Sequence, residues 1–405
     1  MRDAVHLRGA EWHRQRRAAI LRGCPEVGRL LKAGPSRATV PLLVVCNAGQ
    51  LLCALAAPSL LPLLSLILAA VLLGGTLSLW QFALLHDVKH GSASVPWRVS
   101  FNDALFFGSV PSLFGYFLYL RFGHLSHHTG FGKHSLREIF DSRRIAFEDG
   151  DALFTNHRQL LSGDVAGEAP GFAGEEAVGG IRFSIGRFFL SLWRTADTGP
   201  GSPRPCSRAS ICIYNATLYS LSMCLERIFL FLNDRLVSMT GRTPLFHNKP
   251  AAFHATLIAH ARLLSTVHLA LLLLSGPRAL LWLYFAELGW VLPLHPASAM
   301  FFSNHPSSPR AGGCQPTGSL YIGGPWGGRW FDLVCCFSNY HTEHHDFPEV
   351  PCWRLRRLRD LAAPFYSGSA LVGCRDGWLR TVARTFERPG FYACAGTGQG
   401  LAGVD

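Results

Sequence analysis

The sequence predicts an all-α integral membrane protein with four transmembrane helices in two hairpins, a re-entrant or interfacial helix, and a histidine-rich cytoplasmic domain. Three observations predict this fold class. Charged residues make up 16% of the 405 residues and apolar residues 49%, with a mean hydropathy of +0.20, whereas soluble globular chains carry roughly 25% charge. The apolar residues gather into long runs that occur in two pairs, and three histidine clusters follow apolar segments. This composition excludes a disordered chain, a coiled coil and an ordinary soluble enzyme.

The basic residues of the chain favour a membrane surface over nucleic acid. Lysine and arginine exceed aspartate and glutamate by 38 to 26, which gives a net charge of +12. These residues flank apolar runs and form no stripe interleaved with aromatic side chains, so they mark the cytoplasmic side of the spans and suit anionic headgroups. We therefore expect no nucleic-acid partner. The 12 cysteines form no CxxC pair and predict reduced thiols rather than a disulfide framework.

Residues 1–39 are expected to form a cytoplasmic basic segment that contains an amphipathic helix. The first apolar stretch follows directly and is too long for one span, because about 20 residues cross a bilayer. Pro58 and Pro62 divide it into spans 40–57 and 61–85. The two spans form a hairpin, so the chain returns to the side that the preceding basic residues mark as cytoplasmic.

Residues 101–122 are apolar but interrupted by Gly108, Pro111 and Gly115. We expect a re-entrant or interfacial element here, because a full span would place the next histidine cluster on the opposite side of the membrane from the other two. The bilayer tolerates such backbone where it is helical or packed against protein. The following segment, 145–210, is rich in Gly, Ala, Glu and Pro and predicts a flexible cytoplasmic insertion.

The second half of the chain predicts the second hairpin. Residues 211–236 alternate apolar and polar side chains and are expected to lie along the membrane surface. Spans 252–274 and 279–302 follow, separated by a Ser-Gly-Pro-Arg turn. We therefore expect four spans with both termini in the cytoplasm. The membrane domain is predicted to cover 40–365, and a C-terminal tail to cover 366–405.

Eighteen histidines occur in the chain, and three groups of them have the spacing of metal ligands. These HxxxH, HxxHH and HxxHH clusters consist of His86 and His90; His124, His127 and His128; and His341, His344 and His345. Residues i, i+3 and i+4 share one helix face, so each cluster directs its imidazoles to one point. Eight converging imidazoles exceed the needs of a zinc site, which takes four ligands or three plus water, and suit two metal ions. Without thiolate ligands, imidazole-bound iron is a leading candidate for dioxygen chemistry.

Other polar residues are candidates to assist these clusters. His305 is expected where the last span emerges and is a candidate ninth ligand, and Asn304 is a candidate to hold a water at the second metal. Asp87, Glu343 and Asp346 border the clusters and are candidates to accept hydrogen bonds from ligand imidazoles; the alternative is that they are solvated carboxylates. Isolated histidines are expected to be packed, hydrogen-bonded residues, namely His6, His13, His134, His157, His247, His254, His260 and His268.

Three cytoplasmic histidine boxes between two membrane hairpins resemble the membrane fatty-acid desaturase and hydroxylase superfamily, whose members carry HxxxH, HxxHH and HxxHH boxes around two irons. Within it, residues 339–348 (NYHTEHHDFP) are similar to the third box of the sphingolipid Δ4-desaturase (dihydroceramide desaturase) group, and residues 13–27 to the N-terminal region of that group. The superfamily resemblance covers about 40–130 and 250–365. Two features depart from the Δ4 group, since the first box reads HDVKH where that group usually begins with HE, and the insertion at 145–210 is longer.

The resemblance implies that all eight histidines of the boxes are iron ligands, and that His305 stands where relatives often have a further ligand. It implies oxidation of an unactivated C–H bond with O2 as co-substrate, which gives a double bond or, in hydroxylases, an alcohol. The sequence has no HPGG haem motif, GxGxxG flavin fingerprint or ferredoxin cysteines, so the two electrons must come from a separate donor. Cytochrome b5 with its reductase, or a ferredoxin, is the expected partner. Four arginines follow the third box, namely Arg354, Arg356, Arg357 and Arg359. They are a candidate docking site for an acidic donor protein or for anionic headgroups; the alternative is a plain basic membrane flank.

The first expectation is therefore a lipid desaturase that acts on a fatty-acyl or sphingoid chain in the membrane. We expect it in the endoplasmic reticulum, with the boxes and termini cytoplasmic; a plastid membrane is the alternative location. A carotenoid or lipid hydroxylase or ketolase is the alternative within the superfamily. Alternatives from other classes are a zinc-dependent membrane hydrolase and a non-catalytic, histidine-lined metal transporter. A transporter should place its ligands within spans near the bilayer midplane, whereas these clusters flank the spans.

Overall fold

The computed structural model describes residues 9–113, 115–125, 128, 208–241, 251–304, 317–322, 328–366, 373–374 and 377–386. This part of the chain is almost entirely helical. Its two short strands, β1 (Tyr321–Ile322) and β2 (Gly373–Cys374), pair in parallel. The helical fold class that the composition predicts is confirmed.

The N-terminal segment forms α1 (Gly9–Gly23) and α2 (Pro25–Lys32). Pro25 is the first residue of α2. An N–H at this position would have no partner within the helix, so its absence in proline costs no helical hydrogen bond. Helix α1 packs on α17 (His341–Asp346), and α2 packs on α18 (Leu355–Leu361). The basic segment therefore lies against the third histidine box instead of standing apart from the domain.

The first predicted hairpin is present. It consists of α3 (Thr39–Leu60) followed by a second helical stretch made of α4 (Leu63–Ala69), the π-helical turn η1 (Ala70–Gly74) and α5 (Gly75–Lys89). The two stretches, of 22 and 27 residues, are each long and apolar enough to cross a membrane. The chain turns at Leu61, where the backbone is extended, and Pro62. Pro58, the other predicted break, lies inside α3.

The second hairpin is present in part. Residues 254–275 of α13 (Ala251–Ser275) are long and apolar enough to cross a membrane. Gly276, with φ +72°, then leads the chain into α14 (Pro277–Gly289). The prediction of a continuous span over 279–302 is wrong, because α14 has only 13 residues and turns separate it from α15 (Ala297–Ser303).

The early end of α14 is followed by two prolines. Gly289, the last residue of α14, lies so close to the first hairpin that a Cβ there would be 2.5 Å from the carbonyl oxygen of Val71. Pro293 and Pro296 then follow in the turn, and neither has an N–H to donate to a helical hydrogen bond. Within the described ranges, three helices are therefore long and apolar enough to cross a membrane, where the sequence predicts four spans.

The predicted interruption of segment 101–122 is confirmed. This segment consists of α6 (Phe101–Gly108), α7 (Tyr116–Leu118) and the π-helical turn η2 (Tyr119–Gly123). Asn47 and Gln81 donate to the carbonyl oxygen of Gly108 at 2.8 and 2.9 Å, and Nε2 of His268 lies 3.1 Å from the carbonyl oxygen of Pro111. Side chains of α3, α5 and α13 thus satisfy backbone groups where α6 ends, as an apolar environment requires.

A long helix packs on the bundle. Helix α12 (Arg208–Thr240) contains the whole predicted surface segment 211–236, and it packs on α13 and α14. Helix α20 (Trp378–Phe386) packs on α12 and α15. Most of the predicted insertion 145–210, and much of the predicted tail 366–405, lie outside the described residues.

The remaining short helices are α16 (Arg329–Val334), the 3-10 turn η5 (Cys352–Arg354) and α19 (Ala363–Tyr366).

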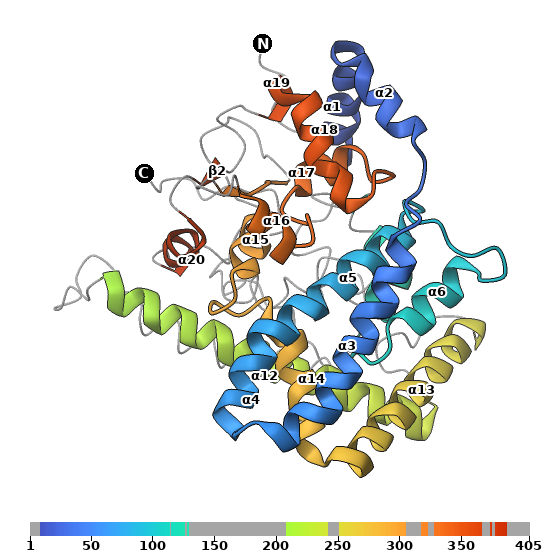
Figure 1. Cartoon of the computed structure of the whole chain (residues 1–405), viewed down its shortest axis with the longest axis vertical. Helices are drawn as coiled ribbons and strands as arrows, with labels where there is room; N and C mark the ends of the chain where they lie inside the picture. The colour runs from blue at the N-terminus through green and yellow to red at the C-terminus, as the bar shows by residue number, and fades with distance from the viewer. Residues whose placement is uncertain are drawn as a thin grey trace, which may run out of the picture.

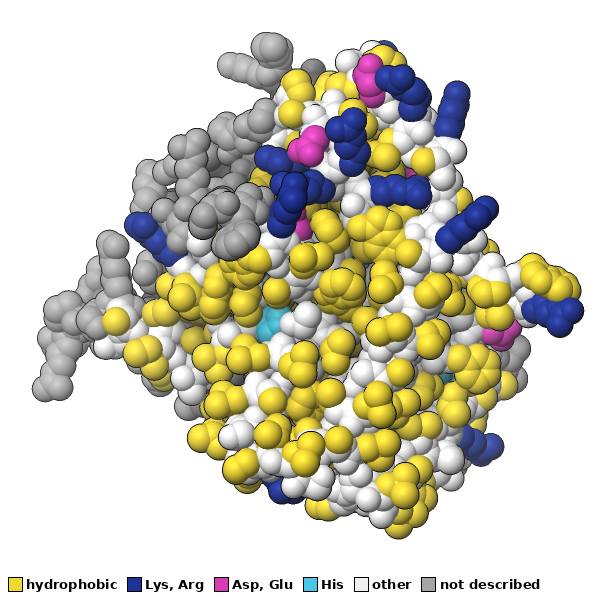
Figure 2. Space-filling model, viewed as in Figure 1, with side chains coloured by type: hydrophobic (Ala, Val, Ile, Leu, Met, Phe, Trp, Pro, Cys, Tyr) yellow, Lys and Arg dark blue, Asp and Glu magenta, His cyan; other side chains and the backbone are white. Residues whose placement is uncertain are grey.

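The described helices lie toward two opposite ends of the molecule. Figure 1 shows α17, α18 and α19 gathered with α1 and α2 at the end opposite the turns of the two hairpins. In Figure 2 hydrophobic side chains cover most of the hairpin end, whereas most visible Lys and Arg side chains lie toward the other end. This separation is that of a membrane protein with a polar head.

Candidate metal centre

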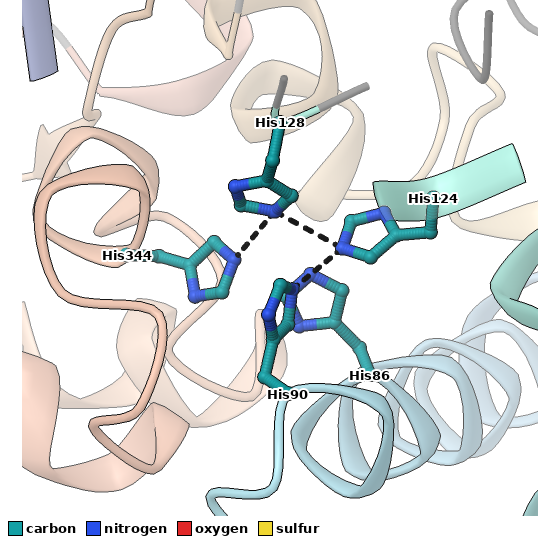
Figure 3. Close-up of side chains that lie close together, drawn as sticks. All are labelled: His86, His90, His124, His128 and His344. Atoms are coloured by element: carbon teal, nitrogen blue, oxygen red, sulfur yellow. Dashed lines mark hydrogen bonds between the residues drawn. The ribbon is translucent and has the colours of Figure 1, made fainter. Parts of the chain in front are cut away.

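Five histidines from all three boxes come together beside the end of α5. His86 lies in its last turn, and His90 directly follows it. His124 directly follows η2, His344 lies on α17, and His128 completes the group. Each offers one ring nitrogen, and these nitrogens all lie within 4.8 Å of one another. Figure 3 shows the five rings directed toward a common point.

The spacing of these nitrogens fits a metal ion. The Nε2 atoms of His90 and His124 lie 2.7 Å apart, those of His124 and His128 lie 3.1 Å apart, and those of His128 and His344 lie 3.2 Å apart. Imidazole nitrogens bind zinc at about 2.0–2.1 Å, so tetrahedral neighbours around one ion are about 3.3 Å apart. Two of these three separations are close to this value and the third is shorter, while all five nitrogens lie within 4.8 Å of one another.

Burial keeps His344 in the form that binds metal. His344 is buried, and burial lowers its pKa well below the usual value, with a further lowering from neighbouring imidazoles, His86 first among them. A metal ligand must be a neutral imidazole, so this environment favours the binding form at neutral pH. The group of five contains neither a carboxylate nor a thiol, which is the nitrogen-only donor set that suits iron, copper, nickel or zinc.

The second box is oriented by the π-helical turn η2, a kind of turn that often occurs at functional sites. The Nε2 atom of His124 faces the other histidines, while its Nδ1 atom lies 3.3 Å from the hydroxyl oxygen of Tyr119. Metal-binding histidines characteristically bond their second ring nitrogen in this way, which fixes the ring and its tautomer. Nζ of Lys89 donates to the carbonyl oxygen of Arg121 at 3.2 Å and joins α5 to η2.

The third box lies on α17, which buried polar groups hold on one side. The fully buried carboxylate of Glu343 accepts hydrogen bonds from Ser319 Oγ at 2.5 Å and from the hydroxyl of Tyr321. The backbone N–H of Thr342 donates to the same Ser319 oxygen at 2.9 Å. Burial raises the pKa of Glu343 to about 7, while these hydrogen bonds act to lower it.

The chain entering the third box is anchored by Asp332. Nδ2 of Asn339 donates to one carboxylate oxygen of Asp332 at 2.9 Å. The hydroxyl of Tyr340 and the guanidinium of Arg356 donate to the other oxygen at 3.0 and 2.9 Å. Residues 339 and 340 directly precede the box, so this carboxylate fixes where α17 begins.

The two other histidines of the third box lie beside the group of five. The ring of His345 stacks on that of His128, with centroids 4.1 Å apart, and lies 4.5 Å from the ring of His341. Of the nine histidines that the sequence nominates as ligands, His127 and His305 lie outside the described residues. The structure therefore brings five nominated ligands into one group and places two more next to it.

The carboxylates that border the boxes are all buried. Asp87 accepts the backbone N–H of Cys352 at 3.2 and 3.1 Å through its two oxygens, and Asp346 bonds to α1. Among the described contacts, none of the hydrogen bonds of Asp87, Glu343 or Asp346 goes to one of the five clustered imidazoles. The backbone carbonyl oxygen of Asn304 accepts a hydrogen bond from the backbone N–H of Gly318 at 2.8 Å.

The isolated histidines that the structure describes include one whose partner lies in the third box, a contact that the sequence does not indicate. His260 and His268 are buried, as expected for isolated packed histidines, and His260 stacks on Phe117 with centroids 4.3 Å apart. His13 is buried and hydrogen-bonded as well, which confirms the same expectation, and its Nδ1 lies 2.7 Å from a carboxylate oxygen of Asp346 in the third box. A signal for His13 itself was present, because it begins the stretch that resembles the N-terminal region of the Δ4 group.

The arginines after the third box serve mainly inside the protein. Arg354 donates to the carbonyl oxygen of Gly34 at 2.6 Å, and Arg356 bonds to Asp332. The guanidinium of Arg359 lies 4.2 Å from the ring centroid of Tyr321. Arg357 is the exposed one of the four. Three of these side chains thus hold the third box region together.

Comparisons with known proteins agree with the histidine boxes. The fatty acid desaturase family model matches residues 215–372, which include α13, α14 and the third box. A Caenorhabditis elegans protein described as a candidate sphingolipid delta(4)-desaturase/C4-monooxygenase is 35% identical over 92 residues, or 22% of each chain. The match therefore spans about a fifth of that relative's length. No solved structure matches the chain significantly. The predicted resemblance to membrane fatty acid desaturases, and to the sphingolipid Δ4-desaturases among them, is confirmed over these parts of the chain.

Proposed function

We propose that this protein is a membrane-bound lipid desaturase that uses two irons and O2 to introduce a double bond into a fatty-acyl or sphingoid chain. The observation that carries the proposal is the convergence of five imidazoles, drawn from all three boxes, within 4.8 Å. The match to the fatty acid desaturase family model and the name of the nematode relative support it.

The five clustered histidines would hold one iron, since their nitrogen spacing fits a single ion. His341 and His345 are close enough to the cluster to hold the second, together with His127 and His305, which lie outside the described residues. Bound iron, supplied with O2 and two electrons, provides the oxidising power that removes two hydrogens from the lipid chain.

The residues of this chain provide placement and partial shielding from water. His124 and His344 are buried, as are Asp87, Glu343 and Asp346 around the boxes, whereas His86, His90 and His128 are partly exposed. The cluster lies where α5 ends, at the end of an apolar helical stretch. A lipid chain lying along that stretch would reach the histidines without leaving the membrane.

The proposed topology places the histidine end of the molecule in the cytoplasm. Three crossings are made by α3, by α4 through α5, and by α13; α14 and α15, with the turns between them, make the fourth. Both termini are then cytoplasmic, in the membrane of the endoplasmic reticulum or, alternatively, of a plastid. The electrons come from a separate protein such as cytochrome b5 with its reductase, or a ferredoxin.

The proposal is tested by expressing the full chain in a yeast strain that lacks the activity and comparing its lipids by mass spectrometry. The expected result is a lipid that has lost two hydrogens, together with iron that co-purifies with the protein. A double variant, His86→Ala with His90→Ala, should give no product, whereas His254→Gln, outside the cluster, should retain activity. Unchanged lipids from a well-expressed wild-type chain would contradict the proposal, and bound zinc without iron would favour a hydrolase.

Hydroxylation is a second candidate reaction, because the name of the nematode relative joins a desaturase to a C4-monooxygenase. The two reactions share the first removal of hydrogen and differ in whether a second hydrogen leaves or oxygen is added. The same lipid analysis separates them, since desaturation removes two hydrogens and hydroxylation adds one oxygen atom.

A further inference from the structure

The third box needs external support to present its histidines. Helix α17 has only 6 residues, and an isolated helix of fewer than about 12 residues is marginal in water. The orientation of His344 and His345 must therefore come from contacts between α17 and other segments. Glu343 and Thr342 are held on one side by the chain at Ser319 and Tyr321.

The second set of contacts with α17 comes from the N-terminal helix α1, whose residues are more than 300 positions away in the sequence. Nδ1 of His13 lies 2.7 Å from one carboxylate oxygen of Asp346, and Nε of Arg16 donates to the other at 3.1 Å. Arg17 donates to the backbone carbonyl of Asp346 at 3.1 Å. Asp346 is 1% exposed, so these are desolvated, charge-assisted contacts of the stronger kind.

His13 also contacts Thr317, which in turn bonds to Thr342 in α17. It is 7% exposed, and its Nε2 lies 3.1 Å from the hydroxyl of Thr317, which in turn donates to the hydroxyl of Thr342 at 3.2 Å. The ring of His13 lies 5.0 Å from that of His345. One buried imidazole thus contacts the end of α17 directly and its beginning through Thr317.

We propose that His13 is a positioning residue of the metal centre, which acts through Asp346 to fix the orientation of α17 and so of His344 and His345. The N-terminal helix is then part of the catalytic domain rather than a membrane-flanking basic segment. This inference rests on the proposed function, since it assumes that the clustered imidazoles hold metal.

The size of the effect follows from the behaviour of other metal sites. Removing a group that orients a metal ligand typically weakens metal binding by about 10- to 100-fold. His13 acts through Asp346, and Arg16 still holds that carboxylate when His13 is changed. The expected loss is therefore at the lower end, about 10-fold.

Two substitutions separate the two bonds of His13. His13→Asn retains an amide N–H near the place of Nδ1 and can still donate to Asp346, whereas His13→Gln carries its amide near the place of Nε2 and serves Thr317 instead. Both variants keep a polar, buried side chain, so they are less disruptive than alanine. Arg14→Ala is the matched control, because Arg14 lies on the same helix with 73% of its side chain exposed.

The experiment titrates the purified full chain in detergent with cobalt(II) and follows its visible absorption, which reports both affinity and coordination geometry. We expect His13→Gln to bind cobalt about 10-fold more weakly with an altered spectrum, and His13→Asn and Arg14→Ala to resemble wild type. Equal behaviour of the Asn and Gln variants, whether both normal or both impaired, would overturn the assignment to Asp346. A wild-type chain that binds no cobalt would instead overturn the metal centre itself, and with it the proposed function.

Discussion

Replacing Asp332 with alanine tests how strongly the entry to the third box is anchored. The carboxylate accepts from Asn339, Tyr340 and Arg356 at 2.9 to 3.0 Å. Hydrogen bonds to a charged group contribute about 1.5–3 kcal/mol each, and the ion pair with the partly exposed Arg356 adds about 0–1 kcal/mol. Because the three donors share one acceptor group, we expect a loss of about 3–5 kcal/mol rather than the full sum.

The assay is thermal unfolding of the purified chain in detergent, with bound iron measured in parallel. A loss of 1 kcal/mol lowers the unfolding midpoint of a domain of 150–250 residues by about 2–4 °C, and that of a larger chain by less. The expected loss of about 3–5 kcal/mol should therefore lower the midpoint of this chain by several degrees. Asp360→Ala is the control, since its side chain is 50% exposed and pairs with Arg359 at 3.6 Å. If Asp332→Ala unfolds at the same temperature as this control, the anchoring role is refuted.

Three further substitutions address the centre and the packing beneath it. His344→Ala should abolish lipid oxidation while the chain still inserts into membranes; product formed at the wild-type rate would show that this imidazole binds no catalytic metal. Tyr119→Phe removes the hydroxyl beside His124 and should weaken cobalt binding by about 10-fold, so an unchanged titration would argue against that orienting role. Gly289→Ala should lower the unfolding midpoint, because its Cβ would lie 2.5 Å from a backbone oxygen and overpacking costs about 1–3 kcal/mol. Gly49→Ala, with its nearest neighbour atom at 3.5 Å, is the control, and equal midpoints for the two would contradict this reasoning.

The features that were predictable from the sequence are those with a local signal. The turn at Pro62 and the long apolar runs on either side of it give the first hairpin directly. Pro111 and its neighbouring glycines give the break in segment 101–122. Histidines spaced i and i+4 share a helix face, which is enough to direct His86 and His90 to one point.

The features that could not be predicted depend on contacts between distant segments. The close packing of α14 on the first hairpin depends on the approach of Gly289 to Val71, and an apolar run gives no sign of which glycine will meet another backbone. The role of His13 depends on Asp346, and neither residue alone suggests the other. A basic run such as that around Arg356 has the same composition whether its side chains face solvent or hold a buried carboxylate.

The carboxylates beside the boxes bond to groups other than the clustered imidazoles. An imidazole that binds a metal is neutral, so a bound cation would bring positive charge into a partly buried site without a carboxylate ligand, which is costly. Asp87, Glu343 and Asp346 directly follow or precede box histidines and are buried, each fixed by hydrogen bonds to other partners. Electrostatic attraction is weakly screened in the interior, so a carboxylate near the cluster, when ionised, would offset part of the charge of a bound cation without occupying a coordination position. Because hydrogen bonds to other groups, including that from His13, already hold these carboxylates, the donors of the cluster are nitrogen atoms only.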